Sequence, residues 1–174
     1  MQLPESRILF DQSTISDAVD ELAKHVNVKC SEGSWLMLSV LTGGLVLAAD
    51  LMRRLQISME LDLIRVSRYH NKTRGAELTW QLEPSASLQN ARVLLVDDIF
   101  DEGETLAALD RYCVSRGAQQ VLSVVLLDKI HNRKVKHYKP DLIGLTCSDE
   151  YVFGYGMDYE GFFRNLPEIR SLGS

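Results

Sequence analysis

The sequence lacks an apolar run of membrane-spanning length, and its first residues, M-Q-L-P-E-S-R, lack the charged-then-apolar order of a signal peptide. It has only three cysteines, an odd number without the spacing of a metal site. These absences argue against a disulfide framework and a zinc cluster. We therefore expect a cytoplasmic protein without membrane association, with reduced thiols at Cys30, Cys113 and Cys147.

The chain also lacks an excess of positive charge. Its 19 Lys and Arg residues face 24 Asp and Glu residues, which gives a net charge of −5. This balance argues against a general nucleic-acid binder, because such proteins carry a basic surface. No internal repeat or low-complexity segment divides the chain. At 174 residues we expect a single domain, residues 1–174, with a core that needs no disulfide or metal.

What is present centres on residues 93–96, Val-Leu-Leu-Val, an apolar run typical of a strand buried on both faces. Two carboxylates, Asp97 and Asp98, follow at its C-terminal end, and Asp101 comes three residues later. A small loop then leads into a helix whose apolar residues recur at helical spacing, with Gly117 as its stop. The pattern predicts a strand, an acidic turn, a loop and a helix in that order.

These elements predict a site with two opposite electrostatic halves. The N–H groups of loop 102–105 and the helix dipole favour a phosphate, to which Thr105 adds a hydroxyl. The aspartate pair favours diol hydroxyls or a magnesium ion. A sugar that carries a phosphate needs both halves. Acid pairs at strand ends also occur in response-regulator receivers and P-loop ATPases, but a receiver does not need this loop, and no G-x-x-x-x-G-K-[ST] is present.

The stretch V-D-D-I-F-D-E-G-E-T-L resembles the phosphoribosyl-pyrophosphate (PRPP) binding motif of type I phosphoribosyltransferases. Three further segments resemble the hypoxanthine-guanine branch of that family, and together the matches span residues 35–167. They read L-T-G-G-L-V-L-A-A-D-L, L-L-D-K-I-H-N-R, and Y-K-P-D followed by D-E-Y-V-F-G-Y-G-M-D-Y-E-G-F-F-R-N-L-P. The first departs from the family in having Thr42 where Lys is usual. The resemblance implies a cis peptide before the first glycine, at Thr42–Gly43.

The resemblance implies an α/β fold, a mainly parallel twisted sheet flanked by helices, with a small hood built from the N- and C-terminal segments. The residue patterns favour the same class. They predict strands over 35–41, 60–67, 77–82, 93–96, 121–127 and 142–145, a helix over 14–26 capped by Ser13 or Thr14, and a helix over 45–55. The basic stretch 68–75 matches in position the mobile lid of the purine phosphoribosyltransferases. Arg68 and Tyr69 stand there where the family often has Ser-Tyr.

By resemblance, each site residue has an expected role. Asp101 is the catalytic residue, which exchanges a proton with the purine N7. Asp97 and Asp98 hold the ribose hydroxyls, directly or through magnesium. Backbone groups of Glu102, Gly103, Glu104 and Thr105 are expected to bind the 5′-phosphate, and Thr42, Gly43 and Arg164 the pyrophosphate. Lys129 is expected to donate to the purine 6-oxygen, Tyr151 to stack on the ring, and Val152 to contact the ring edge. Asp158, together with Asp97, is expected to bind magnesium. Glu102 and Glu104 are unusual for this loop and are expected to point away from the phosphate.

The implied function is purine salvage: transfer of the 5-phosphoribosyl group from PRPP to N9 of hypoxanthine or guanine, giving IMP or GMP and pyrophosphate. The implied cofactor is Mg²⁺, and the implied assembly is a homodimer or homotetramer without nucleic acid. Two alternatives remain open. A phosphoribosyltransferase for xanthine or a pyrimidine would keep the PRPP motif but change the surroundings of Lys129 and Tyr151. A PRPP-sensing regulator of the same fold, such as one that binds RNA, would need a basic surface outside the site.

Overall fold

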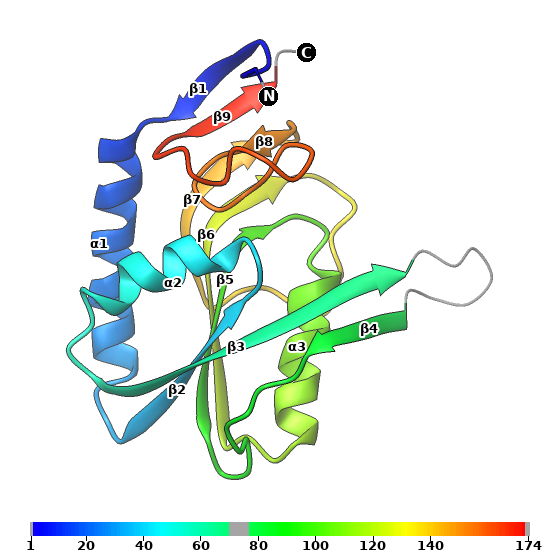
Figure 1. Ribbon diagram of the computed structural model, residues 1–174. Coiled ribbons are helices and arrows are strands. Elements are labelled where there is room, and N and C mark those ends of the chain that lie inside the picture. Colours follow the sequence, from blue (N-terminus) through cyan, green and yellow to red (C-terminus); the bar gives the residue numbers. More distant parts are fainter. Residues whose placement is uncertain (1, 70–76, 173–174) are drawn as a thin grey trace.

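The computed structural model describes residues 2–69 and 77–172 and contains two sheets (Figure 1). The larger sheet has the strand order β4-β3-β2-β5-β6-β7, and all neighbours are parallel except β4, which pairs antiparallel with β3. Its strands are β2 (Ser34–Val40), β3 (Ser58–Tyr69), β4 (Glu77–Leu82), β5 (Arg92–Phe100), β6 (Gln120–Ile130) and β7 (Leu142–Ser148). The expected α/β class with a mainly parallel sheet is confirmed.

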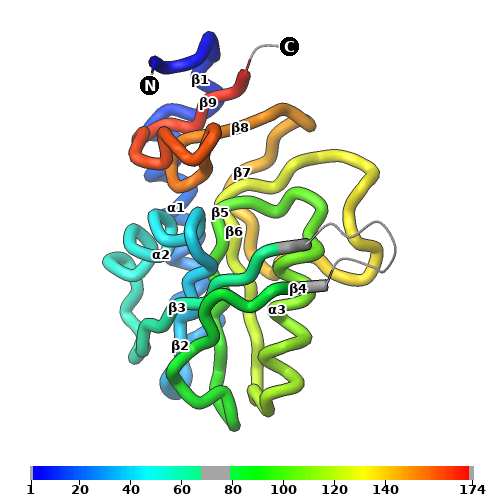
Figure 2. Tube along the Cα trace, turned by 45° about the vertical axis from the view of Figure 1, so that its right-hand side comes forward, coloured from blue at the N-terminus to red at the C-terminus, as the bar shows by residue number. Residues whose placement is uncertain are grey.

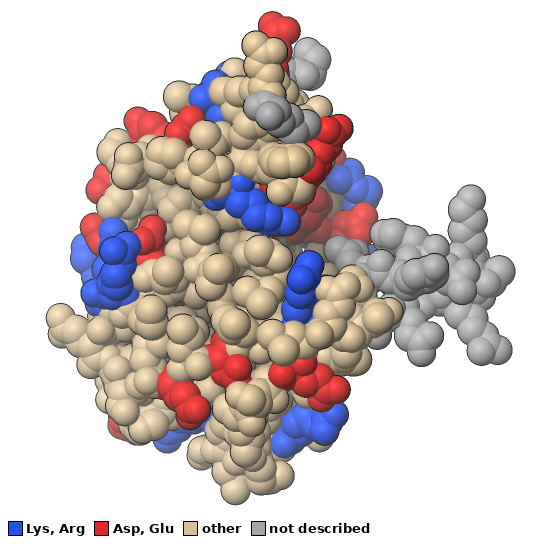
Figure 3. All heavy atoms as spheres, viewed as in Figure 1, with Lys and Arg blue, Asp and Glu red and all other residues tan. Residues whose placement is uncertain are grey.

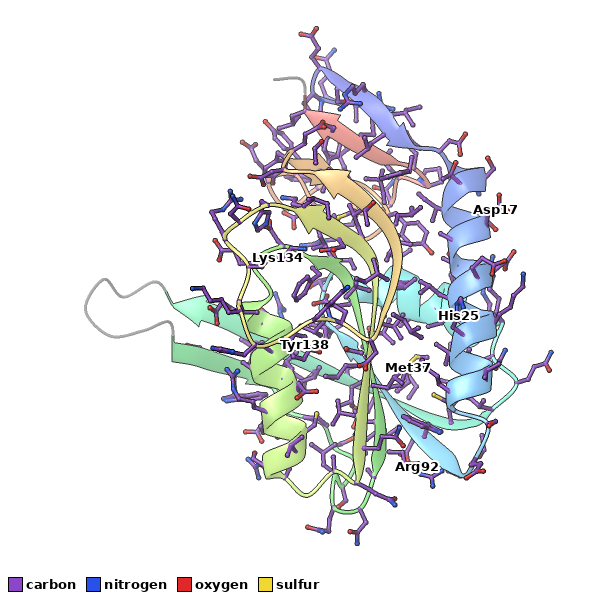
Figure 4. All side chains as sticks on the ribbon, turned by 180° about the vertical axis from the view of Figure 1, so that it is seen from behind. Asp17, His25, Met37, Arg92, Lys134 and Tyr138 are labelled. Carbon is purple, nitrogen blue, oxygen red and sulfur yellow. The ribbon has the colours of Figure 1, made fainter. Side chains whose placement is uncertain are left out.

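Helices cover both faces of this sheet (Figure 1). On one face, α1 (Gln12–Lys29) and α2 (Gly44–Met52) share a core with Met37 and Val96; on the other, α3 (Glu104–Ser115) shares a core with Leu38 and Leu95. Adjacent residues of a strand face opposite sides, so the continuous apolar runs of β2 and β5 supply both cores. Figure 4 shows Met37 between the sheet and α1. Each fully buried Leu or Val contributes about 1.5–3 kcal/mol. Residues 93–96 of β5 are all fully buried and divide between the two cores, so this strand contributes strongly to both.

The helix boundaries differ from those expected. The N-cap of α1 is Asp11, not Ser13 or Thr14, because the Asp11 carboxylate accepts a hydrogen bond from the Thr14 backbone N–H at 2.8 Å. The helix runs three residues further at its C-terminal end, to Lys29. In contrast, α2 ends at Met52 rather than at residue 55. Two hydrogen bonds of the 3₁₀ type end the helix there: Arg54 N–H donates to the Leu51 carbonyl, and Leu55 N–H donates to the Met52 carbonyl.

The smaller sheet joins the two ends of the chain, as expected of the hood. It contains β1 (Ser6–Phe10), β9 (Ile169–Leu172) and β8 (Val152–Phe153) in that order, all antiparallel. Arg170 donates to both the hydroxyl and the carbonyl of Ser6. Figures 1 and 2 show this sheet above the C-terminal ends of β5, β6 and β7. The hood therefore stands over the edge where open α/β sheets bind their ligands.

Among the described residues, no helix is both long and apolar enough to span a membrane. All three cysteines are buried free thiols, as expected. His25 is exposed on α1 (Figure 4), whereas residues 70–76 lie outside the described part of the chain.

Candidate active site

The acid pair lies inside β5 rather than after it. The strand continues to Phe100, since Asp97 still pairs with Val125 and Ile99 with Leu127 of β6. This corrects the expectation of a strand over 93–96 followed by an acidic turn. The apolar run ends at Val96, but the ladder with β6 keeps the backbone extended beyond it. As a result Asp97 and Asp98 are 9% and 8% exposed, more buried than turn residues would be.

Burial is the main electrostatic feature of this pair. It raises the pKa of Asp97 well above its ordinary value, and the adjacent Asp98 charge raises it further. Burial also raises the pKa of Asp98, although a hydrogen bond with the Asp97 side chain, backbone N–H groups and Arg164 oppose the shift. The Asp98 N–H donates to Asp97 Oδ1 at 3.0 Å. Because burial disfavours the charged form of both groups, the two carboxylates favour an added cation or hydroxyl donors.

A cavity of about 200 Å³ lies beside the pair. Its wall includes residues of the predicted PRPP motif: Asp97, Asp98, Asp101, Glu102, Gly103, Thr105 and Leu106. Gly103 adopts φ +82° and precedes α3, where a Cβ would come within 2.4 Å of the Phe100 ring. The N-cap residue of α3 is Gly103, which has no side chain to cap the helix, so the first N–H groups of α3 favour an anion.

The two unusual glutamates of this loop are placed differently. Glu104 is exposed in the first turn of α3, which agrees with the expectation that it points away. Glu102 is half-buried and lines the cavity. Its backbone carbonyl accepts a hydrogen bond from the N–H of Val135 at 2.9 Å, which joins loop 102–105 to the segment after β6.

The glycine loop after β2 closes the opposite wall. The cis peptide is Leu41–Thr42, one bond earlier than expected, because Leu41 N–H still donates to the Ile64 carbonyl and the turn begins directly after it. A Cβ on Gly43 would lie 1.6 Å from Asp98 Oδ2, so the backbone approaches the carboxylate as only glycine allows. Thr42 is exposed.

Asp101 lies at the edge of the cavity with two hydrogen-bond partners. Lys129 Nζ donates to Oδ2 at 2.9 Å, and His131 Nε2 is 2.7 Å from Oδ1. Burial favours the neutral acid, but the hydrogen bonds from Lys129 and His131 outweigh it, and the pKa of Asp101 lies below its ordinary value. Lys129 lies within β6, which extends to Ile130 instead of ending at residue 127. Sequence reasoning missed His131, which directly follows β6, although a spacing of two residues from Lys129 is the spacing of side chains on one face of an extended chain.

The segment from residue 149 onward brings the hood residues to the same edge. Arg164 Nη1 donates to the Gly156 carbonyl at 2.6 Å, and Nη2 pairs with Asp158. A Cβ on Gly156 would lie 2.2 Å from the Gly43 carbonyl oxygen, so the hood contacts the glycine loop directly. Figure 3 shows basic and acidic side chains close together where the hood meets the larger sheet.

The base-binding residues expected in the hood are Tyr151 and Val152. Tyr151 is 51% exposed, and its hydroxyl donates to the Asp158 carbonyl at 3.2 Å. Its ring meets Tyr159 edge to face, with centroids 5.9 Å apart. Val152 is buried and pairs with Ser171 of β9. About half of the Tyr151 side chain is therefore accessible to a ligand.

The first two residues of the expected lid, Arg68 and Tyr69, belong to β3. Their backbone continues the strand opposite Leu78 and Glu77 of β4. The strands expected over 60–67 and 77–82 are confirmed as an antiparallel pair, and the rest of the expected lid, residues 70–75, lies outside the described residues.

A second group of possible metal ligands lies nearby. Ligand atoms of Asp101, His131 and Asp149 lie within 4.8 Å of one another. However, Lys129 already pairs with Asp101, and Arg133 holds Asp149 through two bonds of 2.6 and 2.9 Å. These cations compensate the carboxylates, so the chemistry of this group favours an internal ion-pair network.

The fold and this site define a class. A family profile described as phosphoribosyl transferase domain matches residues 6–160, and the chain belongs to that family. Within it, the chain is 34% identical to the hypoxanthine-guanine phosphoribosyltransferase of Lactococcus lactis, over 95% of this chain and 90% of that protein. The enzyme of the same name from Bacillus subtilis is 33% identical, over 95% of this chain and 92% of that protein.

Solved structures give the same placement. A hypoxanthine phosphoribosyltransferase from Staphylococcus aureus superposes with a TM-score of 0.90 at 29% identity, covering 96% of this chain and 91% of that one. A hypoxanthine-guanine-xanthine phosphoribosyltransferase superposes with a TM-score of 0.87 at 28% identity, covering 97% of both chains. The chain is therefore a phosphoribosyltransferase of the type that these 6-oxopurine enzymes represent.

Proposed function

We propose that the protein transfers the 5-phosphoribosyl group of PRPP to N9 of hypoxanthine or guanine and releases pyrophosphate. The observation that carries this proposal is the pair formed by Lys129 Nζ and Asp101 Oδ2, 2.9 Å apart beside the acid-lined cavity. A 6-oxopurine presents an acceptor, O6, and a proton on N7 next to each other on one edge. The ammonium is only a donor and the ionised carboxylate only an acceptor, so the pair complements that edge.

The PRPP half of the site follows from the cavity. The uncapped N-terminus of α3 and the Thr105 hydroxyl bind the 5′-phosphate, with Glu104 directed to solvent. Asp97 and Asp98 accept hydrogen bonds from the ribose hydroxyls. The pyrophosphate lies between the glycine loop at Thr42–Gly43 and Arg164, whose guanidinium is already near Asp98.

The donor set also fits a magnesium ion. Asp97 and Asp98 are buried oxygen donors whose pKa values are raised by burial, and Mg²⁺ is commonly held by one or two carboxylates together with substrate phosphates. Asp97 would hold the ion near the ribose, and Asp158 would hold it near the pyrophosphate. When bound, the ion would neutralise charge on the leaving pyrophosphate.

The chain's own groups act on the base. Asp101 accepts the N7 proton as N9 bonds to the ribose carbon and pyrophosphate leaves. Lys129 donates to O6, Tyr151 stacks on the ring, and Val152 contacts its edge through the backbone. The hood and the β3–β4 hairpin, including Arg68 and Tyr69, exclude water from the developing positive charge on the ribose.

Incubation of the protein with PRPP, Mg²⁺ and each of hypoxanthine, guanine, xanthine, adenine and uracil, followed by ultraviolet detection of nucleotide, tests the proposal. We expect IMP and GMP to form, and only slow formation of AMP or UMP. Nucleotide formation from uracil alone would overturn the base assignment and leave the PRPP site intact. Absence of product with all five bases, together with RNA binding in a gel-shift assay, would favour a regulator.

We further propose that residues 1–174 act as one domain in the cytoplasm and assemble as a homodimer or homotetramer. Sedimentation equilibrium tests the assembly, because a protomer of 19.6 kDa would give species near two or four times that mass.

A further inference from the structure

His131 contacts the carboxylate oxygen of Asp101 that Lys129 leaves free. Its Nε2 is 2.7 Å from Asp101 Oδ1, and its side chain is 4% exposed. The other ring nitrogen, Nδ1, accepts the backbone N–H of Arg133 at 3.1 Å. Because Nδ1 is an acceptor, the proton of the neutral imidazole lies on Nε2, which donates to Asp101. His131 therefore supplies Asp101 with a second hydrogen bond, from a fixed ring nitrogen.

The position of His131 is fixed from outside the site. Arg133, whose N–H sets the tautomer, is held by two bonds to Asp149 at the end of β7. Two residues later, the Val135 N–H donates to the Glu102 carbonyl in loop 102–105. The turn that carries His131 is thus attached both to β7 and to the PRPP motif. A histidine ring fixed in this way can hold a carboxylate at one orientation.

We propose that His131 is a positioning residue that keeps Asp101 aligned for proton exchange while Lys129 binds the base. The inference rests on the proposed function, in which Lys129 donates to O6 and Asp101 accepts the N7 proton. When a base enters, Lys129 divides its donors between ligand and carboxylate, and its hold on Oδ2 weakens. The Nε2 hydrogen bond then fixes Oδ1 and leaves Oδ2 directed at the base.

Substitutions at His131 separate positioning from packing. His131→Phe and His131→Leu remove the donor but fill the buried space, and His131→Gln retains an N–H at a similar distance from the backbone. We expect kcat to fall roughly tenfold to a hundredfold in the donor-free variants, as a hydrogen bond to a charged group and loss of alignment imply. The KM for PRPP should change less than about twofold, because the proposed function assigns Asp101 to the base and not to PRPP. His131→Gln should recover most of kcat.

His137→Phe is the matched control, since His137 is an exposed histidine in the same segment, and its kcat should equal that of the wild type. Thermal melting followed by circular dichroism identifies the folded variants. The test needs only one of His131→Phe and His131→Leu to be folded. Wild-type kcat in a folded donor-free variant would overturn the inference. So would a Gln variant as slow as the Phe variant.

A double-mutant cycle distinguishes this inference from the function on which it rests. In an Asp101→Ala background, His131→Phe should cause no further loss of kcat, since the group it positions is gone. An equal loss in both backgrounds would show a purely structural role and overturn the inference. A kcat that falls in Asp101→Ala but not in His131→Phe would refute only the role of His131. Wild-type kcat in Asp101→Ala would instead refute the proposed role of Asp101.

Discussion

Repulsion between the two adjacent buried carboxylates, Asp97 and Asp98, should lower the free energy of unfolding of the ligand-free protein. The variant Asp97→Asn, which removes one of the two charges, tests this. The amide keeps the size of the side chain and an oxygen that can accept the Asp98 N–H, now 3.0 Å from Asp97 Oδ1. It removes one of two like charges in a site that is about nine-tenths buried. We therefore expect the variant to be more stable than the wild type at neutral and alkaline pH.

The magnitude follows from the repulsion. Two unit charges about 4 Å apart repel by ~4 kcal/mol at an effective dielectric constant of 20. Water in the adjoining cavity and partial protonation of the pair reduce this value. We expect the free energy of unfolding to rise by about 1–3 kcal/mol at pH 8, and for a chain of this length each kcal/mol raises Tm by about 2–4 °C.

The pH dependence has a defined sign. Burial, and then the Asp98 charge, raise the pKa of Asp97 in the folded protein, so the folded state binds this proton more tightly than the unfolded chain. Wild-type stability is thus lost as pH rises from the ordinary Asp value, about 4, through the raised folded value, and the loss is complete above it. The advantage of Asp97→Asn should accordingly be small at pH 4.5 and largest at pH 8.

Urea unfolding at several pH values measures this difference directly. Asp17→Asn is the control, because Asp17 is an exposed acid on α1 (Figure 4) and its replacement should change stability by less than about 0.5 kcal/mol. A variant no more stable than the wild type at pH 8, or one whose advantage grows as pH falls, would refute the reasoning. Millimolar Mg²⁺ with PRPP should stabilise the wild type more than the variant.

Three further outcomes are expected. Lys129→Gln, whose amide can also accept a hydrogen bond, should narrow the preference for hypoxanthine over adenine, which in the wild type should reach roughly 10⁴-fold in kcat/KM; equal use of both bases by the wild type would contradict this. Asp101→Ala should lower kcat about 10²–10⁴-fold with little effect on PRPP binding measured by calorimetry. Gly43→Ala should weaken PRPP binding, because its Cβ would lie 1.6 Å from Asp98 Oδ2; unchanged affinity would show that the loop can shift.

Much of the larger sheet was predictable because each buried strand carries a local signal. The apolar runs that begin at Trp35, Val93 and Val121 all appear as parallel strands, and the predicted Gly117 stop follows the end of α3. Strand ends were harder to predict. Composition turns polar at Asp97 and at Asp128, but hydrogen bonds to neighbouring strands continue beyond both positions. Those bonds belong to partners distant in sequence, which no local pattern contains.

The site shows the same division. The acid pair, the glycine loop and the start of α3 are short-range features, and the sequence predicted their order along the chain, although it placed the acid pair after β5 instead of within it. The contact of His131 with Asp101 joins residues 30 positions apart, and that of Gly156 with Gly43 joins the hood to the glycine loop. The cis bond at Leu41–Thr42 was misplaced by one residue for a related reason, since the hydrogen bond from Leu41 N–H to the Ile64 carbonyl, which is distant in sequence, continues the contact with β3 up to the turn.

The two halves of the site differ in how far other groups of the protein compensate their carboxylate charges. Asp101 is compensated within the protein by Lys129 and His131, so a base must replace part of an existing contact to bind there. Burial raises the pKa values of Asp97 and Asp98, so hydroxyl donors and a cation would stabilise the charged pair. PRPP with magnesium should therefore bind to the ligand-free protein more readily than the base does, because it relieves repulsion rather than competing with an ion pair. An ordered sequence, PRPP first and base second, follows from that difference in charge compensation.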